Sequence, residues 1–570
     1  MRVDFSFMVG GEAGQGVQSV GFLLARMFSR GGYHVFADQD YESRVRGGHN
    51  FFRIRISTAE VGAIAEDIDI LVALNKETID LHRPKMAQGG IIVYDGDQTQ
   101  GVTGDSHLLR VPLERLAEER AGGKLMINTV ALGAALSLVN YDLGILEKVL
   151  EDRFGKGQVA KQNVAAAQAG YDYVQSEHKG DFHTLESCTP TDRMLLTGNE
   201  ALSLGAIAAG CKFMAAYPMT PASSIMEYLA AKSEDLDLVM VHAEDEIAAI
   251  NMAVGAGYAG VRAMTATSGS GLCLMVEGIG LAAITETPVV IVDGQRPGPA
   301  VGLPTRTEQA DLQFVLHAHH GDFARVVLAP ATVEDAFWTT VKAFNWAEKY
   351  QLPVIILTDQ HLASSYATVD QFDLAKVAID RGLLYSENDA DPQEYMRHRV
   401  TKSGISPRAF PGLGEALVIT DCDEHDESGH LTEDAELRTA QVRKRLRKFH
   451  PLKEEAGTPR GYGPQGAQIT LVGWGSTCGA IREAVDILRR DELDVNMLHL
   501  NELWPFPTQA LVDAIGKTRS TYVIESNATG QLARLIKTET GHDVGGRILK
   551  YDGRPFTPAH IVEAVRKEEG

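Results

Sequence analysis

The chain has 570 residues, of which 44% are apolar and 7% aromatic, with 56 glycines. That length allows several domains of ordinary size, and abundant glycine with few aromatic residues favours α/β domains over all-β sandwiches. The net charge of −22, from 54 basic and 76 acidic residues, argues against nucleic acid as the main partner.

Residues 1–180 predict a doubly wound α/β domain. A strand at Val3–Val9 leads into the glycine-rich turn GGEAGQGV (Gly10–Val17), and apolar residues at helical spacing follow. Gly11, Gly14 and Gly16 would let the backbone approach an anion at the helix N-terminus, but an ordinary tight turn explains them equally well. Their GxxGxG spacing differs from the dinucleotide fingerprint GxGxxG.

A second glycine cluster follows in the same domain. In SRVRGGHN (Ser43–Asn50), Arg44 and Arg46 stand beside two glycines, and basic side chains on a flexible backbone would hold phosphates. An arginine-bearing surface turn is the alternative. The apolar window Leu125–Val139 is too short to span a bilayer and predicts a buried helix instead.

Residues 193–384 repeat the strand–helix alternation and contain the loop AAYPMTPASS. Pro218 and Pro221 stiffen this loop and hold Thr220 between them, with Ser223 or Ser224 predicted to cap the next helix. A rigid loop that presents one hydroxyl suits ligand positioning, while an ordinary helix entry is the alternative.

Two more motifs of this domain carry candidate chemistry. In VHAEDEIAAINMAVGAGYAG, Glu244, Asp245 and Glu246 stand at a helix start. The helix dipole favours acidic residues there, and a carboxylate at a buried strand-to-helix corner is the functional interpretation. The small-residue turn TSGSG (Thr267–Gly271) follows a further strand.

An extended loop, GQRPGPAVGLPTRTEQADL, presents Arg306 between Thr305 and Thr307. Arginine is the natural bidentate partner of a carboxylate, so Arg306 is a candidate to bind an acidic substrate. A structural salt bridge, for example with Glu308, is the alternative.

The periodicity fades over residues 385–461, which predict an irregular charged excursion with one helix near Glu433–Phe449. Residues 462–570 return to strand–helix alternation and predict a small α/β domain. No metal site is predicted. His425 and His430 have loose spacing typical of a solvated acidic loop, and the pair His319–His320 is more typical of a structural role.

The five cysteines are scattered and form no CxxC pair, which predicts reduced thiols in a cytoplasmic protein. The same scatter argues against an iron–sulfur cluster held by this chain alone. The N-terminus has no targeting pattern, so we expect no leader segment.

Taken in order, these motifs resemble those of the 2-oxoacid:ferredoxin oxidoreductases over nearly the whole chain. GGEAGQGV and RVRGGHN resemble a gamma-type domain fused ahead of the alpha part, and YPMTP resembles the family's YPITP-type motif, with Met219 in place of isoleucine. AEDEIAAINMAVGA, TATSGSG and GLPTRTEQADL follow in the family order, and WGSTCGAIREAV, LWPFP and ESNATGQLARL resemble its C-terminal domain. The fused layout, GLPTRTEQ and the EHDESG stretch look most like the 2-oxoglutarate branch.

The resemblance implies four segments. They are a gamma-type domain (1–180), a pyrimidine-side thiamine pyrophosphate domain (193–384), the excursion (385–461) and a transketolase-like C-terminal domain (462–570). It also implies an alpha subunit that is inactive without a beta subunit, which would carry the magnesium–diphosphate site and an iron–sulfur cluster. Ferredoxin would accept the electrons, and an (αβ)2 assembly is expected.

The resemblance further assigns roles to residues. A glutamate would hydrogen-bond the thiamine aminopyrimidine, and counting back from Thr267 gives Glu244, with Glu246 as the rival. The remaining assignments follow the motifs. Tyr217, Pro218, Thr220 and Arg306 would bind the substrate; Thr267, Ser268 and Gly269 would line the thiamine side; Gly11, Gly14, Gly16 and Arg46 would hold coenzyme A.

The implied reaction converts 2-oxoglutarate and coenzyme A reversibly to succinyl-CoA, carbon dioxide and reduced ferredoxin. One alternative keeps this chemistry with pyruvate, a branched-chain oxoacid or an aryl pyruvate as substrate. The other is a non-catalytic assembly subunit or a nucleotide-binding protein without thiamine chemistry.

Overall fold

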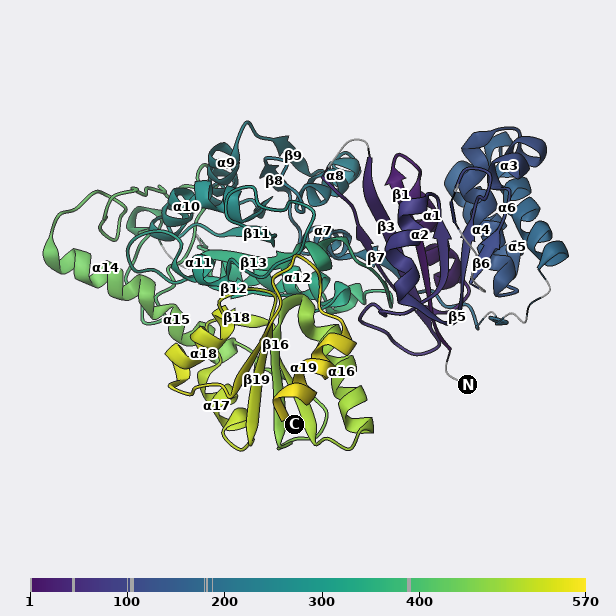
Figure 1. Ribbon diagram of the computed structural model, residues 1–570. Helices are drawn as coiled ribbons and strands as arrows, with labels where there is room; N and C mark the ends of the chain where they lie inside the picture. Colours follow the sequence, from purple (N-terminus) through teal and green to yellow (C-terminus); the bar gives the residue numbers. More distant parts are fainter. Residues whose placement is uncertain are drawn as a thin grey trace. The chain divides into compact units, whose positions relative to one another are not determined.

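The computed structural model describes residues 3–43, 47–99, 101–102, 107–178, 180, 183–186, 188–386 and 391–569. It consists of two compact units, each described by itself (Figure 1). Unit 1 comprises Met1–Leu196, Ser364–Phe372 and Thr557–Ala559, and unit 2 comprises Thr197–Ala363, Asp373–Phe556 and His560–Gly570. The described strands form sheets of eight, seven and five strands.

Unit 1 is built on the eight-stranded sheet, in the order β6-β5-β4-β1-β3-β2-β14-β7. Its strands are β1 (Asp4–Ala13), β2 (His34–Asp40), β3 (Gly47–Ser57), β4 (Ile68–Ala73), β5 (Met86–Tyr94), β6 (Leu108–Arg110), β7 (Met194–Thr197) and β14 (Tyr366–Val369). Its helices are α1 (Val17–Arg30), α2 (Lys76–His82), η1 (Arg83–Lys85), α3 (Leu113–Ala121), η2 (Lys124–Met126), α4 (Ile127–Leu138), α5 (Leu143–Phe154) and α6 (Gln158–Glu177).

This sheet is mixed, because β1 pairs in parallel with β4 and antiparallel with β3. The pairing with β3 continues to Ala13↔Gly47 and extends β1 beyond the predicted end at Val9. The predicted turn Gly10–Val17 is therefore wrong in its first half, which is strand. The residues from Phe5 to Gly11 are buried, so β1 lies in the core of the unit.

The predicted buried helix over the apolar window is confirmed as α4, whose residues from Thr129 to Leu138 are all buried. Within the described ranges, no single helix is long and apolar enough to cross a membrane. One bent pair, Leu113–Ala121 with Lys124–Leu138, meets the length and composition requirement only when its two parts are joined across a 119° bend.

Unit 2 contains the seven-stranded sheet, in the order β18-β12-β13-β11-β10-β8-β9. Its strands are β8 (Phe213–Ala216), β9 (Val239–His242), β10 (Ala263–Thr267), β11 (Val289–Gln295), β12 (Val326–Leu328), β13 (Pro353–Asp359) and β18 (Glu502–Trp504). All neighbouring pairs are parallel except β12 with β18. The helices between them are α7 (Gly198–Ala208), α8 (Ser223–Lys232), α9 (Glu246–Tyr258), α10 (Gly269–Ile284), α11 (Leu312–His317), α12 (Val333–Tyr350) and α13 (Gln360–Ser364).

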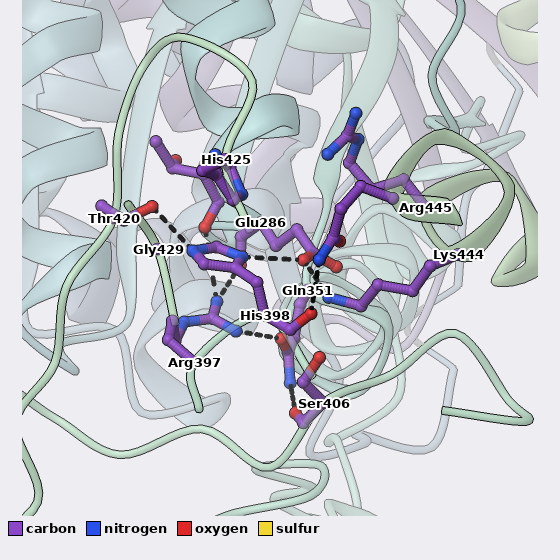
Figure 2. A network of polar contacts seen from close by, with 12 residues as sticks. Glu286, Gln351, Arg397, His398, Ser406, Thr420, His425, Gly429, Lys444 and Arg445 are labelled. Carbon is purple, nitrogen blue, oxygen red and sulfur yellow. Dashed lines mark hydrogen bonds and ion pairs between the residues drawn. The ribbon is translucent and has the colours of Figure 1, made fainter. Parts of the chain in front are cut away.

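The predicted excursion has little regular structure before its helices. The short helix η3 (Leu374–Lys376) precedes it, and its own elements are η4 (Pro392–Glu394), α14 (Ala435–Arg447) and α15 (Phe449–Glu455). The helix α14 confirms the predicted charged helix. A buried polar network connects this segment to Glu286, which follows α10 (Figure 2). Glu286 accepts from Lys444, and His398 Nδ1 lies 3.0 Å from Glu286 Oε1.

The five-stranded sheet of unit 2 has the order β15-β17-β16-β19-β20. Its strands are β15 (Arg460–Tyr462), β16 (Ile469–Trp474), β17 (Val495–Leu500), β19 (Ser520–Glu525) and β20 (Gly546–Leu549). The accompanying helices are η5 (Gly475–Thr477), α16 (Cys478–Arg490), α17 (Thr508–Ile515), α18 (Gln531–Thr540) and α19 (Pro558–Glu569). The two sheets of unit 2 share one apolar core, which contains Leu272, Ile291, Trp474 and Val523.

Candidate active site

The carboxyl ends of the parallel strands in unit 2 gather the predicted motifs at one edge of the seven-stranded sheet. The chain runs from β8 outward to β9 and then returns across β8 to β10, so the strand order reverses between β8 and β10. Open α/β sheets bind ligands at such a switch point, outside the carboxyl ends of the strands. The loops that leave β8 and β10 contain YPMTP and TSGSG.

These two loops touch. The hydroxyl groups of Thr267 and Ser270 lie 3.9 Å and 3.4 Å from Met219 Sδ. Thr267 and Ser268 are buried, and Ser268 Oγ has no hydrogen-bond partner among the described residues. Gly269 begins α10, so the three residues predicted for the thiamine side stand at a helix N-terminus.

The two candidate glutamates, in the turn between β9 and α9, differ in their exposure to solvent. Asp245 is the N-cap of α9 and accepts a hydrogen bond from Ala248 N at 2.7 Å. Glu246 is therefore the first helical residue and is buried at 3% exposure, whereas Glu244 precedes the cap and is exposed. The cap thus turns Glu246 inward and leaves Glu244 toward solvent.

Glu246 faces the TSGSG turn. A Cβ atom on Gly271 would lie 2.6 Å from Glu246 Oε1 and 2.0 Å from Thr267 Oγ1, so these two oxygens border the space that the missing side chain leaves. Glu246 Oε1 has no hydrogen-bond partner among the described residues. A buried carboxylate oxygen without a partner is costly unless a ligand supplies the hydrogen bond.

The YPMTP loop presents its residues at the same edge. Tyr217 and Pro218 are exposed and Thr220 is half-buried. The predicted serine cap is wrong, because α8 begins at Ser223 with Ala222 as its N-cap and no side-chain cap bond. Ser224 Oγ instead accepts a hydrogen bond from Asn199 Nδ2 at 2.8 Å.

The loop that carries Arg306 is anchored by the five-stranded sheet. Gln309 N donates to Ser526 O at 2.6 Å and Gln309 Nε2 donates to Trp474 O at 2.9 Å. Asn527 Nδ2 donates to Gln309 O at 3.0 Å, which gives the ESNATG motif a structural role. Arg306 itself is half-buried. Burial, then the nearby Asp311 carboxylate, raises the pKa of Glu308 to about 7.

Two charged residues without a predicted role lie beside these loops. Asp293 and Arg296 are buried at the end of β11, and Arg296 Nη1 donates to Thr220 O at 2.6 Å. The motif GQRPG indicated a role for Arg296, because a basic residue directly after a buried strand lies at the sheet edge where neighbouring loops meet.

The predicted coenzyme A side lies in unit 1. Gly11 is in β1 and pairs with Asn50, while Gly14 and Gly16 form the turn before α1, with Gly16 as the N-cap at φ 75°. That left-handed backbone is strained for any residue with a Cβ atom. Arg46 and its neighbour Arg44 lie outside the described residues.

The histidines discounted as metal ligands are engaged in other contacts. His425 is buried, with its ring centroid 3.9 Å from that of His398, whereas the His430 side chain is 64% exposed. His319 and His320 stack at 4.1 Å. Within the described part of the chain, no group of three or more His, Cys, Asp or Glu residues could hold a metal ion.

Three family models match the chain. Residues 204–444 match "Pyruvate flavodoxin/ferredoxin oxidoreductase, thiamine diP-bdg", residues 6–173 match "Pyruvate ferredoxin/flavodoxin oxidoreductase", and residues 467–561 match "Pyruvate:ferredoxin oxidoreductase core domain II". The alpha subunit of a Sulfolobus 2-oxoacid:ferredoxin oxidoreductase is 33% identical over 99% of this chain and 96% of its own length. The chain belongs to the 2-oxoacid:ferredoxin oxidoreductase alpha subunits.

Other members of this family extend the comparison. The Mycobacterium tuberculosis 2-oxoglutarate oxidoreductase subunit KorA is 28% identical over 98% of this chain and 90% of its own length. The solved structure of 2-oxoglutarate:ferredoxin oxidoreductase from Magnetococcus marinus, with 2-oxoglutarate, coenzyme A and succinyl-CoA bound, covers 100% of both chains. Its sequence identity is 34% and its TM-score 0.93. The predicted family and fold class are confirmed.

Proposed function

We propose that this chain is the alpha subunit of an enzyme that reversibly converts 2-oxoglutarate and coenzyme A to succinyl-CoA and carbon dioxide, with reduction of ferredoxin. The observation that carries the proposal is the full-length likeness to the Magnetococcus marinus enzyme, whose structure contains 2-oxoglutarate, coenzyme A and succinyl-CoA. Relatives named 2-oxoglutarate synthase subunit KorA support the same substrate. Pyruvate is the second candidate, because the matching family models are described as pyruvate oxidoreductases.

Thiamine diphosphate, when bound, supplies the electron sink that lets a 2-oxoacid lose carbon dioxide. The residues present fit its pyrimidine ring. We assign the ring-contacting role to Glu246 and no longer to Glu244, because Glu246 has a buried oxygen without a partner beside Thr267. The Glu246 carboxylate would exchange a proton with a ring nitrogen, and the polar atoms of Thr267 and Ser268 would border the same ring.

Substrate contacts are proposed on the neighbouring loops. Thr220 would donate a hydrogen bond to an oxygen of the 2-oxoacid, with Tyr217 and Pro218 lining the entrance. Arg306 would bind a substrate carboxylate through paired hydrogen bonds. The rigid anchoring of its loop by Gln309 favours that role, since binding then costs little ordering of the backbone.

The remaining assignments are also proposals. Gly11, Gly14, Gly16 and Arg46 would hold coenzyme A. A beta subunit would carry magnesium, the diphosphate site and an iron–sulfur cluster, in an (αβ)2 assembly that reduces ferredoxin. The four-segment domain division and a cytoplasmic location stay predictions.

The test is coenzyme A-dependent dye reduction by the complete complex purified from its host, with 2-oxoglutarate and pyruvate compared. Activity on 2-oxoglutarate supports the proposal, and activity on pyruvate alone replaces the substrate. Glu246→Gln should lower kcat by about 100-fold or more, because it removes an acid–base group. The matched variant Glu244→Gln should stay within about twofold of wild type. The reverse pattern would return the role to Glu244.

A further inference from the structure

Arg296 connects two loops of the proposed active site. Its Nη1 atom donates to the main-chain carbonyl oxygen of Thr220 at 2.6 Å, and the residue is only 8% exposed. The two residues are 76 positions apart and follow β11 and β8, the strands on either side of β10. A buried cation at one strand end therefore fixes the main chain of the loop at another.

The end of β11 is shaped to receive the Thr220 loop. A Cβ atom on Gly294 would lie 2.9 Å from Pro221 Cγ and 3.5 Å from Thr267 O. Only glycine lets the loop approach this closely without a shift, because the pyrrolidine ring is rigid. The loop thus packs on Gly294 and is hydrogen-bonded two residues later, by Arg296.

Two carboxyl groups, those of Asp311 and Asp293, lie close enough to act electrostatically on the buried Arg296 guanidinium. Asp293 is fully buried, and neither of its carboxyl oxygens has a hydrogen-bond partner among the described residues. Asp311 Oδ2 would lie 2.5 Å from a Cβ atom on Gly269, which places this carboxyl at the N-terminus of α10. Gln295 Oε1 accepts from Asp311 N at 3.1 Å and holds this carboxylate-bearing segment at the end of β11.

The two carboxyl groups near Arg296 differ in pKa. Burial raises the pKa of Asp293 well above its usual range, and the Asp311 carboxylate raises it further. Burial raises the pKa of Asp311 to about 6 even though Arg296 opposes the shift. Asp311 is therefore the carboxyl group whose pKa stays nearer its usual range, and Arg296 is the neighbouring charge that opposes the rise.

We propose that Arg296 is a positioning residue for the 2-oxoacid, which holds the Thr220 main chain so that the threonine hydroxyl meets the substrate. This inference rests on the proposed function and deepens it, because it assigns control of substrate affinity to a residue outside the YPMTP motif. Arg296 acts through Thr220 and makes no contact with substrate in this scheme.

The test uses the complete complex and separates kcat from KM. Arg296→Ala should raise KM for the 2-oxoacid by about tenfold or more, because it removes a hydrogen bond from a charged donor. Its content of bound thiamine diphosphate should equal that of wild type. Arg296→Lys, which keeps the charge, should restore part of the affinity, and it provides the kinetic readout if the alanine variant does not assemble.

Arg262 offers a matched control. It is also buried and donates to a main-chain carbonyl, Ala209 O, at 2.6 Å, but it precedes β10 at the opposite edge of the sheet. Arg262→Ala should lower the unfolding temperature and leave KM unchanged. Thr220→Val and Arg296→Ala should also be combined in a double variant. Its kcat/KM should be less than about threefold below that of the more impaired single variant, because the effects of residues that act as a unit do not add.

The outcomes are distinct. A wild-type complex that reduces dye with none of the 2-oxoacids would reject the proposed function and this inference with it. An active wild type whose Arg296→Ala variant keeps its KM and loses only stability would overturn the inference alone. Effects of Thr220→Val and Arg296→Ala that multiply in the double variant would overturn it too, since Arg296 would then act independently of Thr220.

Discussion

The buried network around Glu286 allows a stability prediction that depends on which charge is removed. Glu286 is 0% exposed and forms an ion pair with Lys444 (Figure 2). It also pairs with Lys448, so one carboxylate faces two lysine amino groups. Although burial opposes it, Lys444 and Lys448 hold the pKa of Glu286 well below its usual range. Burial lowers the pKa of Lys448 to about 7 even with this partner.

These charges set the magnitudes. Glu286→Gln removes the buried carboxylate that both lysine amino groups face and should cost about 3–5 kcal/mol in unfolding free energy. Lys448→Met should cost only about 1–2 kcal/mol, because Lys444 still neutralises Glu286 and methionine has a similar volume. At roughly 2 °C per kcal/mol, the unfolding temperature should fall by about 6 °C or more for Glu286→Gln and by about 2–4 °C for Lys448→Met.

The pH dependence adds a second readout. The folded pKa of Lys448 lies below the unfolded value, so between about pH 7 and 10.5 the unfolded chain binds more protons. Lys448 should therefore make wild type more stable as pH rises through this window, by up to about 1.4 kcal/mol per pH unit. Lys448→Met should lose that slope.

The assay is thermal unfolding of the complete complex from pH 7 to 9, with wild type, Glu286→Gln and Lys448→Met compared under the same buffer conditions. The reasoning would be refuted if Lys448→Met destabilised as strongly as Glu286→Gln at pH 7. It would also be refuted if the pH slope of Lys448→Met matched that of wild type.

Two further predictions concern the loops and the helix that leads into the site. Arg306→Ala should raise KM for the 2-oxoacid or lower kcat/KM by about tenfold or more, since it removes a charged hydrogen-bond partner, and an unchanged kcat/KM would exclude Arg306 from the site. Thr197→Ala should lower the unfolding free energy by about 1 kcal/mol, because Thr197 and Glu200 form a capping box at α7, and a denaturant midpoint equal to that of wild type would contradict this.

Local periodicity predicted several elements well. The apolar window became α4, and the charged stretch after residue 433 became α14. The strand β3 (Gly47–Ser57) was missed, because RGGHN has the composition of a turn and its pairing with β1 joins residues up to 53 positions apart, as in Asp4↔Ser57. No local pattern reports such a long-range antiparallel partner, so the sequence also placed the end of β1 too early.

The choice between Glu244 and Glu246 shows why sequence spacing alone could not identify the glutamate of the site. Both residues stand close to the counted distance from Thr267, and both are acidic residues near a helix start. The N-cap decides their environment. Aspartate is among the most favoured caps, so Asp245 before an apolar run carried the signal that α9 begins at Glu246.

The same limit explains why Arg296 carried no prediction. Its partner is a main-chain carbonyl, and main-chain atoms are common to every residue, so nothing in YPMTP marks Thr220 O as an acceptor. The strand order supplies the missing information. Because β8, β10 and β11 are adjacent and parallel, the loops that follow them must share one edge, and a buried arginine at that edge needs acceptors from its neighbours. Ordered motifs predict which loops form a site, whereas the contacts that fix those loops emerge only when the sheet places their ends side by side.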